Sequence, residues 1–201
     1  MEDWVEMIMN KSALESNLTF ASLYIAIYEN FVYRVVDNIK LLLCDWGVKD
    51  GTEYVTETET YKSSIKNRIV DEFGNKDITK ASFLLLKDWG AIDDTDYELF
   101  LKIKKNRNNF AHELFRVVLK GVTDDEIISF IEMINLQKKT TSWWFVNVEA
   151  SIDDYDLPDD FDYSNVSNLD CLVWQVVIDV LYRDKSDEYK KILDSIRNNE
   201  A

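Results

Sequence analysis

The chain has 201 residues, and its 38 acidic and 23 basic side chains give a formal net charge of −15 at pH 7. This charge excludes a protein that coats nucleic acid through a broad basic face, because such binding needs clustered Lys and Arg to displace counterions from the phosphates. Any contact with nucleic acid must therefore be local. Because 46% of the residues are hydrophobic, we expect one globular domain over residues 1–201 with a well-packed core.

The sequence also indicates the cellular compartment in which the protein resides. Cys44 and Cys171 are too few for a disulfide framework, and they lack the third thiol or His cluster of a structural zinc site. The first residues show no basic segment followed by an apolar stretch, and the most apolar window, Phe20–Val36, contains too many polar residues for a membrane span. We expect a cytoplasmic protein that binds no metal and no cofactor.

Apolar residues recur three and four positions apart, and the chain has five Gly and one Pro, which predicts an all-α fold. The first long helix covers Leu18–Trp46, with Gly47 capping its C-terminus. Further helices are predicted over about Tyr54–Phe73, Thr79–Trp89, Thr95–Lys120, Thr123–Lys138, Ser167–Tyr182 and Asp184–Arg197. Two of them begin with the pattern of a capping box, Thr95 with Glu98 and Thr123 with Glu126.

One segment resembles another within the chain. Residues 41–54 and 84–97 are identical at nine of fourteen positions, and both contain the sequence Leu-Leu-Leu-x-Asp-Trp-Gly. Either the two segments are similar connections between helices, or they mark a duplicated helical hairpin. Two copies are fewer than the three or more that indicate a solenoid.

The helical pattern fails from Thr140 to Tyr163. We expect a short strand or an aromatic loop over Trp143–Val148, followed by an acidic loop over about 149–163. Seven acidic residues lie between Glu149 and Asp162. This loop is either a solvated surface segment or a segment that limits access to a basic site elsewhere.

The main basic concentration of the chain directly precedes its only histidine. Lys102, Lys104, Lys105 and Arg107 lead to His112. Histidine can both take and give a proton near neutral pH, and Arg offers a permanently charged fork that matches phosphate oxygens. Together they suit phosphodiester chemistry.

Helical spacing places Asn108 and His112 on one face, because they lie four residues apart. Lys105, Asn109 and Arg116 project to the same side, and with Lys104 they are the candidate RNA-binding residues. Phe110, Leu114, Val117 and Val118 lie on the opposite side and should face the core, so we expect His112 to be exposed.

Arg107 breaks this pattern. It lies five residues before His112, which is about 140° around an ideal helix and points into the apolar face. Either the helix is distorted near Asn106–Asn109, or Arg107 is buried against a partner. A broken local rule of this kind is typical of functional sites.

The segment Arg107-Asn108-Asn109-Phe110-Ala111-His112 resembles the motif of the HEPN superfamily, in which a polar residue follows an Arg and four to six residues separate the Arg from a His. The resemblance implies a small helical bundle that forms a homodimer. It also implies a metal-independent endoribonuclease of the toxin–antitoxin, abortive-infection or antiviral-defence type, with RNA as substrate and an antitoxin or a nucleotidyltransferase-type protein as a partner. Other members of the superfamily are inactive and serve in binding or assembly, and this alternative stays open.

Carried over by position, the resemblance makes His112 the general acid or base, Arg107 the phosphate-binding residue, and Asn108 the polar residue that orients them. One chain supplies one His, so an acid and base pair built from histidines needs two chains. The sequence lacks a Gly-rich phosphate loop, a nucleophile elbow and a zinc-ligand spacing, so nucleotide hydrolysis, esterase and metalloprotease chemistry have no support.

Overall fold

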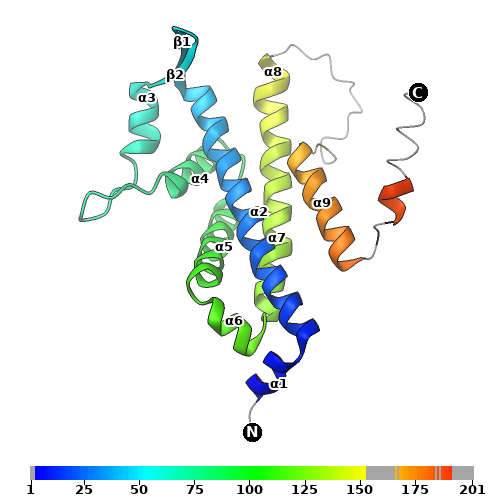
Figure 1. Ribbon diagram of the computed structural model, residues 1–201. Helices are drawn as coiled ribbons and strands as arrows, with labels where there is room; N and C mark the ends of the chain where they lie inside the picture. Colours follow the sequence, from blue (N-terminus) through cyan, green and yellow to red (C-terminus); the bar gives the residue numbers. More distant parts are fainter. Residues whose placement is uncertain (1–2, 153–165, 167, 184, 186, 192–201) are drawn as a thin grey trace. The chain divides into compact units, whose positions relative to one another are not determined.

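The computed structural model describes residues 3–152, 166, 168–183, 185 and 187–191. The chain divides into two compact units, Met1–Thr140 and Thr141–Ala201, which we treat separately. The first unit is made of helices and one small antiparallel hairpin (Figure 1). Its helices are α1 (Asp3–Met9), α2 (Lys11–Leu43), α3 (Glu59–Tyr61), α4 (Ile78–Asp88), α5 (Asp94–His112), α6 (Leu114–Lys120) and most of α7 (Asp124–Trp144). The predicted helical fold is confirmed for these residues.

The core lies where α2 meets α4, α5 and α7. Tyr24 of α2 packs against Phe110 of α5 and Phe130 of α7, with ring centroids 4.9 and 5.9 Å apart. Phe83 of α4 stacks on Phe100 of α5 at 3.6 Å. These aromatic contacts hold the helices in fixed positions along one face of α2. No helix in the described part of the chain has the length and the apolar character that a membrane span requires.

Helix α2 confirms the predicted Leu18–Trp46 helix but has different ends. It begins at Lys11, after Asn10 accepts a hydrogen bond from the backbone of Ala13 at 3.1 Å. It ends at Leu43 because the chain then turns into a strand.

The C-terminal cap predicted at Gly47 is wrong. Gly47 lies in β1 (Cys44–Lys49), which pairs with β2 (Thr52–Glu57), and it faces Tyr54 across the pair. The turn between the strands is Asp50-Gly51, whose φ angles of 52° and 74° suit the tight turn of a two-residue hairpin.

The second Leu-Leu-Leu-x-Asp-Trp-Gly segment does form a connection between helices. Helix α4 confirms the predicted Thr79–Trp89 helix, and Gly90, at φ 75°, carries the chain out of it. The two similar segments therefore adopt different structures, and residues 41–54 and 84–97 are not two copies of one helical hairpin.

The helix predicted over Tyr54–Phe73 is wrong for most of its length. Its first residues belong to β2, and only α3 and a single π-helical turn, η1 (Lys62–Lys66), are helical. Thr58 starts this short helix, because its hydroxyl accepts a hydrogen bond from the backbone of Tyr61 at 3.1 Å.

The helix predicted over Thr95–Lys120 is two helices, α5 and α6, separated at Glu113. The capping box at its start is formed by Asp93 and Asp96 rather than by Thr95 and Glu98. The box predicted at Thr123 is confirmed, since Thr123 and Glu126 exchange hydrogen bonds of 2.9 and 3.3 Å.

Helix α7 continues past the predicted end at Lys138 to Trp144. It is followed by a π-helical turn, η2 (Phe145–Glu149), and by α8 (Ala150–Ile152), so the strand or loop predicted over Trp143–Val148 is wrong. The acidic loop predicted over about 149–163 is wrong for residues 149–152, which are helical, and the rest of it lies outside the described residues.

In the second unit, α9 (Leu169–Tyr182) confirms the predicted helix, and Asn168 caps it by accepting from the backbone of Cys171 at 2.9 Å. The helix predicted over Asp184–Arg197 falls largely outside the described residues, within which residues 187–191 are helical.

Candidate functional site

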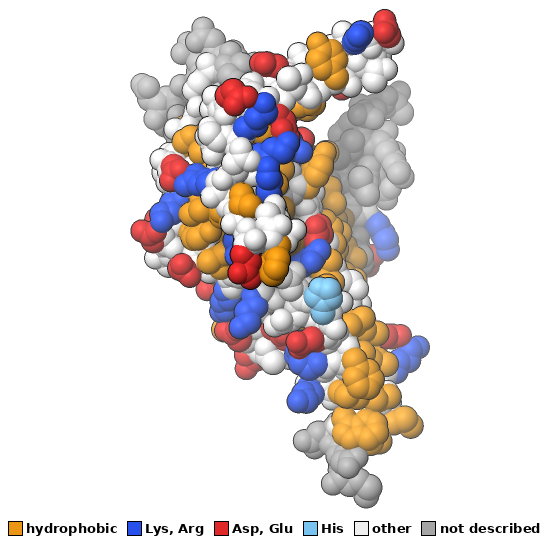
Figure 2. Space-filling view, turned by 90° about the vertical axis from the view of Figure 1, so that its left-hand side faces the viewer, with side chains coloured by type: hydrophobic (Ala, Val, Ile, Leu, Met, Phe, Trp, Pro, Cys, Tyr) orange, Lys and Arg blue, Asp and Glu red, His pale blue; other side chains and the backbone are white. Residues whose placement is uncertain are grey.

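The C-terminal half of α5 carries the predicted site. The helix buries Phe100, Ile103 and Phe110, and this orientation turns Asn108 and His112 to the surface. His112 is the last residue of α5, and Asn108 lies one turn before it. Figure 2 shows the pale blue histidine, the only one in the chain, at the molecular surface, with both basic and acidic side chains near it.

Arg107 lies against α2, and α5 is continuous at this point. Its guanidinium forms an ion pair with Glu29, lies 5.7 Å from the ring centre of Tyr28, and donates to Asn108 Oδ1 at 3.1 Å. The Arg107 side chain is 29% exposed, and its Nε, which is buried, has no hydrogen-bond partner among the described residues. The unusual helical position of Arg107 is therefore explained by a partner within the chain, not by a distorted helix.

Two tyrosines on the buried face of α2, Tyr24 and Tyr28, have raised pKa values. Burial and the nearby Glu29 carboxylate raise the pKa of Tyr28 above its ordinary value. Burial also raises the pKa of Tyr24 to about 12, and its hydroxyl lies 2.8 Å from Ser129 Oγ. Both tyrosines are therefore neutral at physiological pH, and the ring of Tyr28 lies against the Arg107 guanidinium.

The three predicted catalytic residues are partly brought together. Arg107 and Asn108 are hydrogen-bonded, but in the described part of the chain no hydrogen bond or ion pair connects His112 to either of them. The Arg107–Asn108 pair and His112 share the last two turns of α5. This geometry leaves the imidazole free to act on a group outside the chain.

The predicted RNA-binding residues separate into exposed and internally bound side chains. Lys105 is exposed, and Asn109 is half-buried. Lys104 is held by Asp77, with Nζ–O distances of 2.7 and 2.9 Å. Burial acts to raise the pKa of Asp77, but the hydrogen bonds from Lys104 outweigh it and hold that pKa below its usual range.

Arg116 is also occupied within the chain. Its guanidinium pairs with the buried carboxylate of Glu126, which is 8% exposed and is also bound by Thr123. It donates in addition to the carbonyl of Gly121 at 3.4 Å. The surface next to His112 therefore offers Lys105 rather than Arg116 to a polyanion.

Three neighbours of the site were not predicted from the sequence. Glu29 and Tyr28 come from a helix far away in the chain, and no local pattern connects them to Arg107. Phe115, three residues after His112, is 73% exposed, and Leu114, predicted to face the core, is 43% exposed. The helical pattern could have identified Phe115, because it lies on the side of α6 away from the buried Val117.

The described residues contain no group of three or more His, Cys, Asp or Glu that could hold a metal ion. No family model, no curated protein and no solved structure matches this chain.

Proposed function

We propose that this protein is an endoribonuclease of the HEPN type, in which His112, Arg107 and Asn108 cleave RNA by attack of a ribose 2′-OH. The observation that carries the proposal is the arrangement on the last two turns of α5. There an exposed His112 follows an arginine that is already oriented by Asn108 and by the ring of Tyr28.

The proposed reaction needs a base, an acid and a cation. A general base removes the proton of the 2′-OH, O2′ attacks the adjacent phosphorus, and the bond to the 5′ oxygen breaks while a general acid protonates that oxygen. The products are a 2′,3′-cyclic phosphate and a 5′-OH. Arg107 stabilises the negative charge on the phosphate oxygens through its amino groups, which hold Asn108 and Glu29 before the substrate binds.

One His112 serves as base or acid, and the His112 of a second copy takes the other role, so we propose a homodimer as the active species. Phe115, three residues after His112, supplies an exposed aromatic face on which an unpaired base can stack. The action would be of the toxin or phage-defence type, on RNA that is single-stranded at the cleavage site.

A second function is favoured by the Glu29 ion pair. Both amino groups of Arg107 already have partners without a substrate, one in Glu29 and one in Asn108. In a helical interaction protein without catalysis, Arg107 would join α5 to α2 through Glu29, and His112 would contact the partner protein.

The deciding experiment incubates the purified protein with total RNA in EDTA and determines the ends of the products. His112→Ala should abolish cleavage, and Glu98→Ala, an exposed substitution on the same helix, is the matched control. Cyclic phosphate ends that require His112 support the ribonuclease. Equal cleavage by wild type and His112→Ala, at equal melting temperatures, would contradict it and leave the interaction protein.

A further inference from the structure

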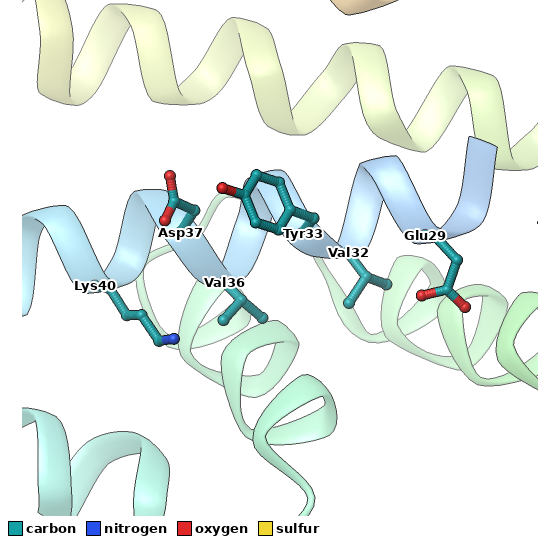
Figure 3. A pocket seen from close by; sticks show the side chains of 6 residues that line it. All are labelled: Glu29, Val32, Tyr33, Val36, Asp37 and Lys40. Atoms are coloured by element: carbon teal, nitrogen blue, oxygen red, sulfur yellow. The ribbon is translucent and has the colours of Figure 1, made fainter. Parts of the chain in front are cut away.

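The surface of α2 carries a shallow hollow of about 250 Å³, whereas pockets for drug-sized ligands measure about 300–1,000 Å³. All the side chains that line it come from α2 (Figure 3), and they are Glu29, Val32, Tyr33, Val36, Asp37 and Lys40. Tyr33 and Asp37 are one helical turn apart and form one side of the hollow. Val32 and Val36 form the other side in the same way. The size and the aromatic and aliphatic sides suit a single planar ring system.

The hollow begins at the candidate site. Glu29 lines it and also pairs with Arg107. The rings of Phe20 and Phe110 lie 6.0 Å apart. Since these two residues come before Glu29 in α2 and after Arg107 in α5, the two helices run antiparallel. Along the helix pair, His112 therefore lies on one side of Arg107 and the hollow lies on the other.

Three side chains of the hollow are available to a ligand. The Tyr33 ring is 63% exposed and contacts no other ring in the described part of the chain. Neither Asp37 nor Lys40 forms an ion pair or a side-chain hydrogen bond with any described residue. Glu29 is held by Arg107, so Asp37 is the carboxylate in the hollow that remains available.

The Asp37 carboxylate restricts which base the hollow can bind. A carboxylate only accepts hydrogen bonds, so it selects a ring with N–H donors. Guanine presents two neighbouring donors, N1–H and N2–H, which match the two oxygens of one carboxylate. Adenine and cytosine present one amino group beside an acceptor nitrogen, and uracil presents one N–H between two carbonyls. Unpaired bases in single-stranded RNA expose this edge, so guanine is the base that fits best.

We infer that this hollow is a guanine-binding subsite, in which the base lies against the Tyr33 ring and donates N1–H and N2–H to Asp37. The inference rests on the proposed function, in which Arg107 binds the phosphate at the cleaved bond. The guanine then belongs to a nucleotide next to that bond, on the side away from His112. Lys40, eleven residues or about 16 Å beyond Glu29, offers a cation to the RNA backbone past the base.

The test measures base preference without cleavage. The probes are four fluorescent single-stranded pentanucleotides with 2′-fluoro sugars, which lack the attacking 2′-OH. Each has G, A, C or U at its centre and uracil at the other positions. By fluorescence anisotropy, wild type should bind the guanine probe about fivefold or more tightly than the other three, which is the lower end of the discrimination from one bidentate contact to a base.

Asp37→Asn should bind the adenine probe best, because an amide offers one acceptor and one donor, which match the amino group and N1 of adenine. Tyr33→Ala should weaken binding of the guanine probe about fivefold or more, through the loss of stacking. Asp45→Asn makes the same change of charge at an exposed position of β1 outside the hollow, and as the control it should behave like wild type. Circular dichroism and melting temperatures establish that each variant is folded.

Equal affinities for the four probes, no binding of any probe, or a guanine preference that persists in Asp37→Asn would each overturn the guanine subsite. These affinities do not depend on catalysis, so the effect of His112→Ala on cleavage tests the ribonuclease separately. In the cleavage assay, sequenced product ends should carry G at one fixed position next to the cut in wild type, and A at that position in Asp37→Asn. Cut sites without a base preference would also overturn the subsite.

Discussion

Glu29 on α2 and Arg107 on α5 form an ion pair between residues 78 positions apart in the sequence. The carboxylate offers Arg107 the same kind of oxygen ligand that a phosphate would. Both side chains are partly exposed, at 50% and 29%, so water screens the attraction and the pair can open at small cost. Arg107 is therefore oriented in the absence of substrate, and it can still exchange the Glu29 carboxylate for a phosphate.

Arg107→Lys should lower RNA cleavage by about tenfold or more while changing the free energy of unfolding by less than about 1 kcal/mol. The lysine keeps the charge, but it loses the planar fork that contacts Glu29 and Asn108 together. Single-turnover cleavage and urea unfolding measure the two effects. Arg68→Lys is the matched control, because Arg68 forms a similarly exposed pair with Asp88 at 2.7 Å. Unchanged cleavage in Arg107→Lys would contradict a phosphate-binding role.

Phe115→Ala should weaken the binding of single-stranded RNA about 5- to 100-fold, which is the usual loss for one stacked base. Phe73→Ala provides the comparison, because Phe73 is also exposed, at 81% against 73% for Phe115, and lies far from α5 in the sequence. Neither substitution should lower the melting temperature by much. Fluorescence anisotropy with a labelled oligonucleotide gives both affinities, and equal losses in the two variants would remove the assignment of a stacking site.

Arg116→Ala should act on stability rather than on RNA. It leaves the carboxylate of Glu126, which is 8% exposed, without its main cation and should cost about 2–3 kcal/mol of unfolding free energy. Lys105→Ala should show the reverse, with weaker RNA binding and unchanged stability, because Lys105 is exposed. Urea unfolding and RNA titration of both variants at low temperature separate the two roles. A loss of affinity in Arg116→Ala without a loss of stability would restore Arg116 to the RNA surface.

The repeated Leu-Leu-Leu-x-Asp-Trp-Gly segment shows how far local sequence determines this fold. Up to the glycine the copies differ only at Cys44 and Lys87, yet α2 ends at Leu43 and the first copy continues as a strand, whereas the second copy remains helical to Asp88. The difference lies downstream, where Asp50-Gly51 in the first copy favours a hairpin and Asp93-Asp94 in the second favours the start of a helix. The Asp-Gly pair predicts a hairpin turn at this position, whereas the spacing of apolar residues alone predicts a helix.

The candidate site was predictable to the extent that it is local. Residues on one helix, such as Asn108 and His112, share a face because of the helical repeat, and their exposure follows from the burial of Phe110. The internal roles of Lys104 and Arg116 were not predictable, because their partners come from other turns and helices. Spacing along one element carries no information about which distant carboxylate will pack against it.

Gly51→Ala should destabilise the hairpin by about 1 kcal/mol, because Gly51 has a φ of 74° that alanine adopts only with strain. Open space surrounds the position, so the cost comes from the backbone and not from a clash. Gly51→Asn should recover part of the loss, since Asn tolerates left-handed φ values. Hydrogen exchange of β1 and β2 amides reports the local effect, and equal protection in wild type and Gly51→Ala would contradict the strained turn.

The buried tyrosines predict how stability depends on alkaline pH. The pKa of Tyr24 is about 12 in the folded chain and 10.0 without the effects of burial. The unfolded state therefore releases a proton at lower pH than the folded state does. The stabilisation is fully present below pH 10 and is lost as the pH rises toward 12, by up to about 1.4 kcal/mol per pH unit.

Tyr24→Phe should make this decline shallower, since the variant has no proton to release at that position. At pH 7 the variant should lose about 1 kcal/mol, because its ring no longer offers a hydroxyl to Ser129. Urea unfolding at pH 8, 10 and 11 compares the two proteins. Tyr28 also has a raised pKa, so Tyr24→Phe removes only part of the slope, and Tyr24→Phe combined with Tyr28→Phe should remove more. Parallel curves for wild type and Tyr24→Phe would contradict the buried, neutral hydroxyl group of Tyr24 beside Ser129.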